Sequence, residues 1–213
     1  MPERFSVIRI HNDGVVPIGM REATEAQEIA CYALAWTTRI ASGDLAFMIN
    51  TNDPAGAARA FDVQWVFGNV TEMLRSQLVA FWLQEGASTN PDEAWRRAFE
   101  VACVLEDEAT GSIAGVCTVA IHMDDHGRSY GFVRIFIRPR DRAVGLNVRL
   151  MQRMIEGFTM LAREPGGPHR LVATIENRKL ERRAAQRILA RLGFAHVGVA
   201  PNGERVMQRV LAT

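Results

Sequence analysis

Three strand-like stretches follow one another between residues 100 and 138, and they constrain the fold more than any other feature. They are 100–107 (EVACVLED), 112–123 (SIAGVCTVAIHM) and 130–138 (YGFVRIFIR), all rich in β-branched residues. The segments between them, EATG and DDHGRS, have the residues that favour turns. Strands joined by such short turns pair antiparallel, so the sequence predicts a β-meander.

The pattern after the meander alternates between helix and strand. It predicts a helix from about 146 to 163, a strand at 170–176, a helix at 180–193 that Gly193 ends, and a final hairpin around PNGE. The apolar face expected for the first of these helices consists of Val148, Met151, Met154, Ile155, Phe158 and Leu161. This order of elements predicts a mixed sheet of the α/β (α+β) class.

Helical patterns dominate before residue 100. A short strand is expected at 5–10, helices at 24–43 and 69–86, and a helix start at 90–99 where Asn90 precedes a proline. Residues 51–60 are ambiguous, and residues 43–68 are extra sequence. All four tryptophans lie in this half, and Trp36 and Trp82 fall within amphipathic patterns that favour the core.

Composition limits the class of protein. The 213 residues, 48% hydrophobic and 23% charged with a net charge of +1, suit one globular domain. A near-neutral chain argues against broad nucleic-acid binding. No stretch is long and apolar enough to span a bilayer, and the N-terminus lacks a secretory pattern. Three widely spaced cysteines, Cys31, Cys103 and Cys117, favour a reducing compartment, so we expect a cytoplasmic protein.

The stretch IRPRDRAVGLNVRL, residues 137–150, joins a predicted strand to a predicted helix. The first backbone N–H groups of a helix lack intrahelical partners and carry partial positive charge. Gly145 would let an anion such as a phosphate approach them closely, and three neighbouring arginines could add contacts. A surface turn with solvated arginines is the alternative reading of this stretch alone.

Two motifs in order give the second half a family resemblance. Ile137-Arg138-Pro139 leads into Arg142-Ala143-Val144-Gly145-Leu146-Asn147, and downstream Asn177 follows a strand before RLGFAHVG at 191–198. In this order and spacing, residues 98–212 resemble the GNAT acyltransferases, which transfer an acyl group from acyl-CoA to an amine.

The resemblance implies a fold, an activity and partners. The fold would be a central, mixed and mostly antiparallel sheet, splayed between two strands and flanked by helices. A single domain would span 1–213, with 1–97 shaping the acceptor site and 98–213 binding CoA. The activity would be direct transfer of an acetyl group from acetyl-CoA to a primary amine on a small molecule or protein. A homodimer is compatible with this reading.

The resemblance also implies which residues bind CoA. The amides from Ala143 through Val144, Gly145 and Leu146 to Asn147 would hold the pyrophosphate. Arg142 would lie over it, and Arg140 or Arg138 would meet the outer phosphates. The main chain of Ile135 and Ile137 would pair with the pantetheine arm. Asn177 would hold a water or a pantetheine amide, or else cap a helix.

Three positions depart from the family's pattern. Asn147 stands where a second Gly or Ala is usual, Gly131 where a Glu often acts as base, and Leu189 where a Tyr often acts as acid. Glu176 and Tyr130 are the substitutes that we consider for proton transfer. Their alternatives are a solvated strand end for Glu176 and packing on the sheet for Tyr130.

The departures keep other functions open. A GNAT-fold protein without catalysis, serving in binding or assembly, is the main alternative. A toxin that acetylates aminoacyl-tRNA is less favoured, because the chain is near-neutral and lacks the Tyr. The cluster HMDDH at 122–126 has metal-ligand residue types, but its place in a turn explains them better. No metal site is predicted.

Overall fold

The computed structural model describes residues 59–124, 126–175 and 183–211. The expected strand at 5–10 and helix at 24–43 lie outside these residues, as do Glu176 and Asn177. Helices and strands occur in the order β1 (Phe61–Trp65), α2 (Glu72–Gln84), α3 (Pro91–Arg97), η1 (Ala98–Glu100), β2 (Val101–Asp107), β3 (Ser112–Met123), β4 (Ser129–Ile137), η2 (Pro139–Asp141), α4 (Leu146–Leu161), β5 (Arg170–Ile175), α5 (Arg183–Arg191), β6 (Ala195–Val199) and β7 (Arg205–Val210).

The strands form one sheet in the order β1-β2-β3-β4-β5-β7-β6. The predicted meander is β2, β3 and β4, and both of its pairings are antiparallel. Among the strands that the structure describes, only β4 and β5 pair in parallel. The final hairpin, β6 and β7, pairs with β5 through β7, so the sheet is mixed and mostly antiparallel, as the sequence predicts.

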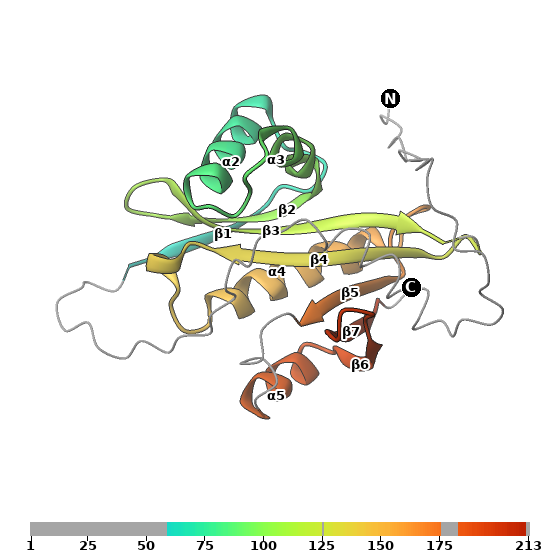
Figure 1. Cartoon of the computed structure of the whole chain (residues 1–213). Coiled ribbons are helices and arrows are strands. Elements are labelled where there is room, and N and C mark those ends of the chain that lie inside the picture. Colours follow the sequence, from blue (N-terminus) through green and yellow to red (C-terminus); the bar gives the residue numbers. More distant parts are fainter. Residues whose placement is uncertain (1–58, 125, 176–182, 212–213) are drawn as a thin grey trace.

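Helices cover both faces of this sheet (Figure 1). The buried residues of α4, among them Met154 and Phe158, pack with Cys117 and Val133 of the sheet in the larger core cluster. On the opposite face, Phe81 and Trp82 of α2 pack with α3 and with Val104 and Val116 of the meander, which makes a second cluster. Trp82 is therefore a core residue, as its helical pattern predicts.

Local sequence sets the starts of α2 and α3. The Thr71 side chain accepts a hydrogen bond from the Leu74 amide (3.2 Å) at the start of α2. Asn90 Oδ1 accepts hydrogen bonds from the Asp92 and Glu93 amides (2.9 and 3.3 Å) and precedes the proline that begins α3. The predicted helix start at Asn90 is therefore confirmed.

Strand β1 was absent from the sequence prediction, which found mainly helical patterns before residue 98. The strand pairs with β2 at the edge of the sheet, so the sheet begins earlier than residue 98. The segment FDVQW alternates apolar and polar residues, which is the period of a half-buried strand. Trp65 packs edge-on against Phe158 of α4 (5.2 Å between ring centroids) and anchors this edge.

The sheet is split between β4 and β5. The two strands pair only from Tyr130 to Phe132, opposite Arg170 to Val172. Beyond these residues β4 continues to Ile137 and β5 to Ile175 while the strands separate, as Figure 1 shows from right to left. The predicted splay between two strands is therefore confirmed.

Candidate functional site

The turn from β4 into α4 has the geometry of an anion site. β4 ends at Ile137, the short helix η2 follows, and α4 begins at Leu146 with Gly145 as its N-cap. No side chain of a described residue caps this start, and Leu146 N–H donates only to the Ala143 carbonyl (3.4 Å). A helix start of this kind offers backbone N–H groups to a ligand. Gly145 has φ +88°, and a side chain there would meet open space. Glycine thus permits both the backbone conformation and close approach of an anion.

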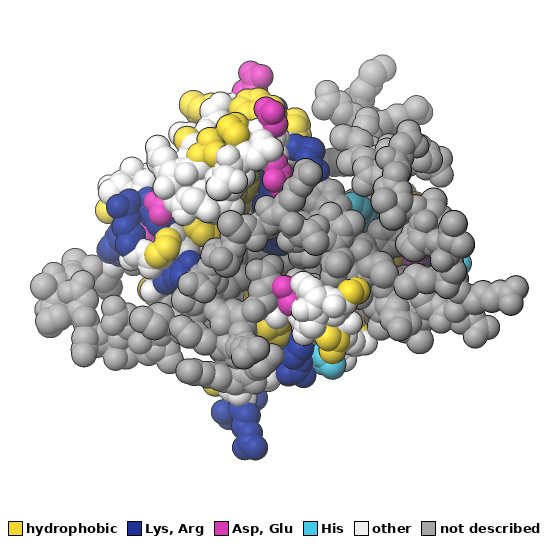
Figure 2. Space-filling model, viewed as in Figure 1, with side chains coloured by type: hydrophobic (Ala, Val, Ile, Leu, Met, Phe, Trp, Pro, Cys, Tyr) yellow, Lys and Arg dark blue, Asp and Glu magenta, His cyan; other side chains and the backbone are white. Residues whose placement is uncertain are grey.

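Two arginines of the turn are available to such an anion. Arg140 is exposed, and Arg142 is half-buried with its Nε donating a hydrogen bond to the Ile137 carbonyl (3.0 Å). That bond holds Arg142 beside the end of β4 and leaves its terminal nitrogens for other partners. Dark blue Lys and Arg side chains gather at the left end of Figure 2, over the end of the sheet where β4 meets η2.

Arg138 differs from the expectation that it meets the outer phosphates. Its side chain is buried, with 6% of the residue exposed, and its Nε donates to Asp141. Glu85 at the end of α2 lies 4.0 Å from the same Nε. A guanidinium held inside the protein by two carboxylates serves the structure of the turn, so Arg140 is the better candidate for the outer phosphates.

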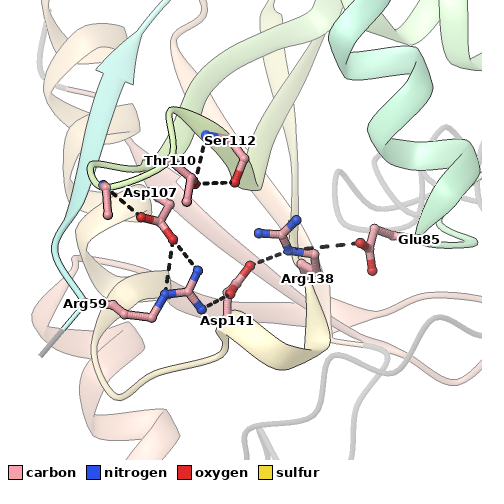
Figure 3. A network of polar contacts seen from close by, with 8 residues as sticks. Arg59, Glu85, Asp107, Thr110, Ser112, Arg138 and Asp141 are labelled. Atoms are coloured by element: carbon pink, nitrogen blue, oxygen red, sulfur yellow. Dashed lines mark hydrogen bonds and ion pairs between the residues drawn. The ribbon is translucent and has the colours of Figure 1, made fainter. Parts of the chain in front are cut away.

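A network of ion pairs fixes η2 to distant parts of the chain (Figure 3). Asp141 accepts hydrogen bonds from Arg138 and from Arg59 Nη1 (2.6 Å for Arg59). Arg59 also binds Asp107 at the end of β2, and the hydrogen bond from Arg59 lowers the pKa of that carboxyl. Both aspartate side chains are buried. The network therefore ties the turn between β4 and α4 to the residue just before β1, to β2, and to α2 through Glu85.

The main chain of β4 faces the split at alternate residues. The Arg138 amide donates to the Ala114 carbonyl of β3 (2.8 Å), so by alternation the polar groups of Ile135 and Ile137 point away from β3. The Ile137 carbonyl already accepts a hydrogen bond from Arg142 Nε. The groups of Ile135 thus line the open edge on which the sequence predicts a pantetheine arm.

Tyr130 lies at the closed end of the split, where β4 and β5 pair. It is buried, and its hydroxyl donates to Asp124 Oδ2 (3.2 Å). Burial raises the pKa of the phenol, which makes it a weaker acid. This setting favours the alternative that the sequence left open, an aromatic side chain packed on the sheet.

Packing explains two of the departures from the family's pattern. A side chain at Gly131 would approach Val119 Cγ1 to 2.8 Å and Leu171 Cδ2 to 3.0 Å, so this part of the sheet has no room for a glutamate. Leu189 of α5 packs against the larger core cluster. Asn147 lies in the first turn of α4, partly exposed beside the anion site.

The Asp124 side chain organises the turn between β3 and β4. Its Oδ1 accepts hydrogen bonds from the amides of His126 and Arg128 (3.0 and 2.8 Å), and its Oδ2 binds Arg128 Nε (2.6 Å).

Within residues 59–124, 126–175 and 183–211, no three His, Cys, Asp or Glu side chains form a metal-binding group. Across the same residues, no helix combines the length and apolarity that crossing a membrane requires.

One charged pair near the split gave no signal in the sequence. Glu100, at the end of η1, interacts electrostatically with Arg134 of β4. The sequence placed both residues in ordinary strand patterns, and only the pairing of β2, β3 and β4 brings them together.

Comparison with known proteins bears on the fold. No protein-family model and no curated protein sequence matches the chain. Solved structures do: a GNAT-family acetyltransferase from Streptococcus pneumoniae matches at 18% identity with a TM-score of 0.52, covering 72% of this chain and 100% of its own. The fold is that of the GNAT acetyltransferases.

Other solved acetyltransferase structures agree with this fold. A protein from Salmonella typhimurium, described as an acetyltransferase and solved with acetyl-CoA, matches at 19% identity and a TM-score of 0.53, covering 72% of this chain and 95% of its own. A ribosomal-protein-S5-alanine acetyltransferase from Vibrio fischeri matches at 14% identity and a TM-score of 0.50, covering 75% and 97%. The GNAT resemblance read from the sequence is therefore confirmed for the fold.

Proposed function

We propose that this protein is an N-acyltransferase that moves an acetyl group from acetyl-CoA to a primary amine by direct transfer. The observation that carries the proposal is the uncapped start of α4 at Gly145, placed where the sheet splits between β4 and β5. A phosphate-binding helix start beside an unpaired strand edge fits a ligand with a pyrophosphate and a peptide-like arm.

Each part of acetyl-CoA has a place in this proposal. The backbone amides from Ala143 to Asn147 bind the pyrophosphate, with Arg142 beside it, and the exposed Arg140 meets the outer phosphates. The pantetheine arm adds to β4 along Ile135 as a further strand would. The acetyl thioester then lies in the split between β4 and β5, within reach of an amine.

The chemistry in this proposal needs no covalent intermediate on the protein. The amine nitrogen attacks the thioester carbon, the C–N bond forms, and the C–S bond breaks with its electron pair passing to sulfur. The protein contributes by holding the two reactants in contact, which lowers the entropic part of the barrier. Glu176 remains a sequence prediction for proton transfer.

A titration with acetyl-CoA tests the binding site. Ligand at about 100 times its dissociation constant stabilises a protein by about 2.7 kcal/mol, which for a chain of this size raises Tm by roughly 5–11 °C. We expect Gly145→Glu to abolish the shift, because its carboxylate would occupy the anion site. Gly203→Glu is the matched control: Gly203 also has a positive φ (+86°) with open space around it, but lies in the β6–β7 turn.

Two results would count against the proposal. Absence of any Tm shift at millimolar acetyl-CoA would show that the protein has no acyl-CoA site. An equal shift for Gly145→Glu and wild type would show that the ligand binds elsewhere.

A catalytically silent GNAT-fold protein is the second candidate. The observation in its favour is that Val119 and Leu171 fill the space at Gly131, where the family's pattern often has a base. Release of the CoA thiol in the presence of primary amines separates the candidates. Binding of acetyl-CoA with no release above the rate of its spontaneous hydrolysis would support the silent protein.

A further inference from the structure

Arg134 lies where β4 and β5 begin to separate, on the face of the sheet that carries α2 and α3. Side chains alternate along β4, so Arg134 and Phe136 share one face while Ile135 points to the α4 side. The Phe136 ring lies against Phe81 of α2 (5.7 Å between centroids), which fixes that face. Arg134 is two residues beyond Phe132, the last β4 residue that pairs with β5, so it stands where the split begins.

Glu100 lies on the same face, across the meander from Arg134. It ends η1 and immediately precedes Val101, which pairs with Thr118 of β3, and Thr118 pairs with Arg134. Val101 belongs to the core cluster under α2 and α3. The Glu100 carboxylate interacts electrostatically with Arg134 of β4 and with Arg96 and Arg97 of α3, so it lies on the side of the sheet away from α4.

The Glu100 carboxylate is incompletely satisfied. Its Oε2 is buried and accepts no hydrogen bond from any residue that the structure describes. A buried carboxylate oxygen without a donor costs free energy comparable to a lost hydrogen bond or more. Such a cost is ordinary at a site that a cationic ligand completes.

The charges around Glu100 tune its acidity. Burial raises the pKa of its carboxyl and Glu93 adds to this, while Arg134 of β4 and Arg96 and Arg97 of α3 oppose the rise. The net direction of the pKa shift is upward. A carboxylate whose pKa lies nearer the working pH is a better proton acceptor.

We propose that Glu100 receives the ammonium group of the acceptor and takes its proton. The inference rests on the proposed acetyl transfer and names its acceptor class, a cationic primary amine. The amine approaches from the α2 and α3 face, past Arg134, while CoA lies along the Ile135 edge. Glu100 thereby fills the role for which the sequence suggested Glu176 and Tyr130.

The transfer balances with Glu100 as the base. The ammonium gives one proton to the Glu100 carboxylate and becomes a neutral amine, whose lone pair forms the C–N bond. The C–S bond breaks, and its electron pair goes to the CoA sulfur. The second proton leaves nitrogen and ends on sulfur, which yields the amide and the CoA thiol. Glu100 then returns its proton to solvent.

The decisive variant is Glu100→Gln, which keeps the shape of the side chain and removes the base. With spermidine, tyramine and tetra-alanine as acceptors, we expect kcat/KM of the best amine at pH 7 to fall by about 10²-fold or more. The acetyl-CoA concentration at half-maximal Tm shift should stay within about twofold, since the proposal places CoA against Ile135 and the Gly145 turn and not against Glu100.

A pH profile separates a base from a merely structural group. Wild-type kcat/KM should be flat between the pKa of Glu100 and the pKa of the amine, because the reacting pair there is a carboxylate and an ammonium. In Glu100→Gln only the free amine reacts, so kcat/KM should climb about tenfold per pH unit up to the pKa of the amine. Glu100→Asp, which keeps a carboxylate, should retain the flat profile at a lower rate.

Folding of the variant is not at risk from this change. Because the folded-state pKa of Glu100 is raised, its contribution to stability is lost as pH rises from the ordinary carboxyl range through that raised value. Glu100→Gln should therefore melt above wild type at pH 8 and lose that advantage below pH of about 4. Glu108→Gln, an exposed carboxylate just after β2, is the matched control for rate and stability.

The outcomes distinguish the two proposals. If wild type binds no acetyl-CoA or releases no CoA thiol with any of the three amines, acetyl transfer and the role of Glu100 both fall. If wild type acetylates an amine and Glu100→Gln does so within threefold, with the same pH profile, the role of Glu100 falls and acetyl transfer stands.

Discussion

Removing Asp141 tests the idea that a buried ion-pair network holds the turn between β4 and α4. Asp141 is 3% exposed and Arg138 6% exposed. Asp141→Ala leaves the Arg138 guanidinium buried, with Glu85 at 4.0 Å as its remaining carboxylate partner in the network. Breaking a buried pair by removing one partner typically costs about 3–5 kcal/mol. For a chain of this size that cost lowers Tm by roughly 6–20 °C.

A double variant separates the loss of the Arg138–Asp141 attraction from the cost of leaving the Arg138 charge buried without its partner. Arg138→Met with Asp141→Leu removes both charges and keeps comparable volume, so stability should return to within about 1 kcal/mol of wild type. Asp62→Ala is the control, because Asp62 is exposed on β1, and surface changes usually stay within about 0.5 kcal/mol.

Urea unfolding followed by circular dichroism measures these differences, with acetyl-CoA titration alongside. We expect Asp141→Ala to weaken acetyl-CoA binding as well, because η2 leads directly into the Gly145 turn. A loss under about 1 kcal/mol for Asp141→Ala, or a double variant that is less stable than the single one, would refute a desolvated network as the support of the turn.

Three further predictions concern other parts of the fold. Tyr130→Phe should cost about 0.5–1.5 kcal/mol through its lost bond to Asp124, and CoA-release assays should show an unchanged rate, whereas a rate loss above tenfold would restore Tyr130 as a catalytic acid. Gly157→Ala should cost about 1–3 kcal/mol in thermal unfolding because its methyl group meets the Trp65 ring; the exposed Met160→Ala on the same helix should be neutral, and a neutral Gly157→Ala would contradict the packing of β1 on α4. The pKa of Asp124 is lowered by hydrogen bonds from Arg128 and His126 that outweigh burial, so the stability lost in Asp124→Asn at pH 7 should disappear as pH falls below about 4; a cost that persisted at pH 2 would show that the charge is not responsible.

Repeating patterns of neighbouring residues predicted most of the elements. The meander, the α4 helix with its apolar face, and the final hairpin all followed from local periodicity and turn residues. Strand β1 carried the same kind of signal in FDVQW, but at five residues it was short and stood in a region of helical patterns. The Gly145 turn was predictable because its geometry depends on residues adjacent in sequence.

The sequence failed where a side chain's partner lies far along the chain. Arg138 reads as one of three similar arginines, and only burial against Asp141 and Glu85 separates it from Arg140. The network at Asp141 depends on Arg59, 82 residues away. Nothing in a local pattern encodes such a contact.

By itself, then, the sequence determined most of the strands and helices and the turn at Gly145, because these are set by interactions within a few residues. Tertiary structure decided which charges are buried and what surrounds Glu100. Burial removes water from a charged group, and how much water is removed depends on segments that the fold brings together. The chemistry proposed for Glu100 depends on that second kind of information.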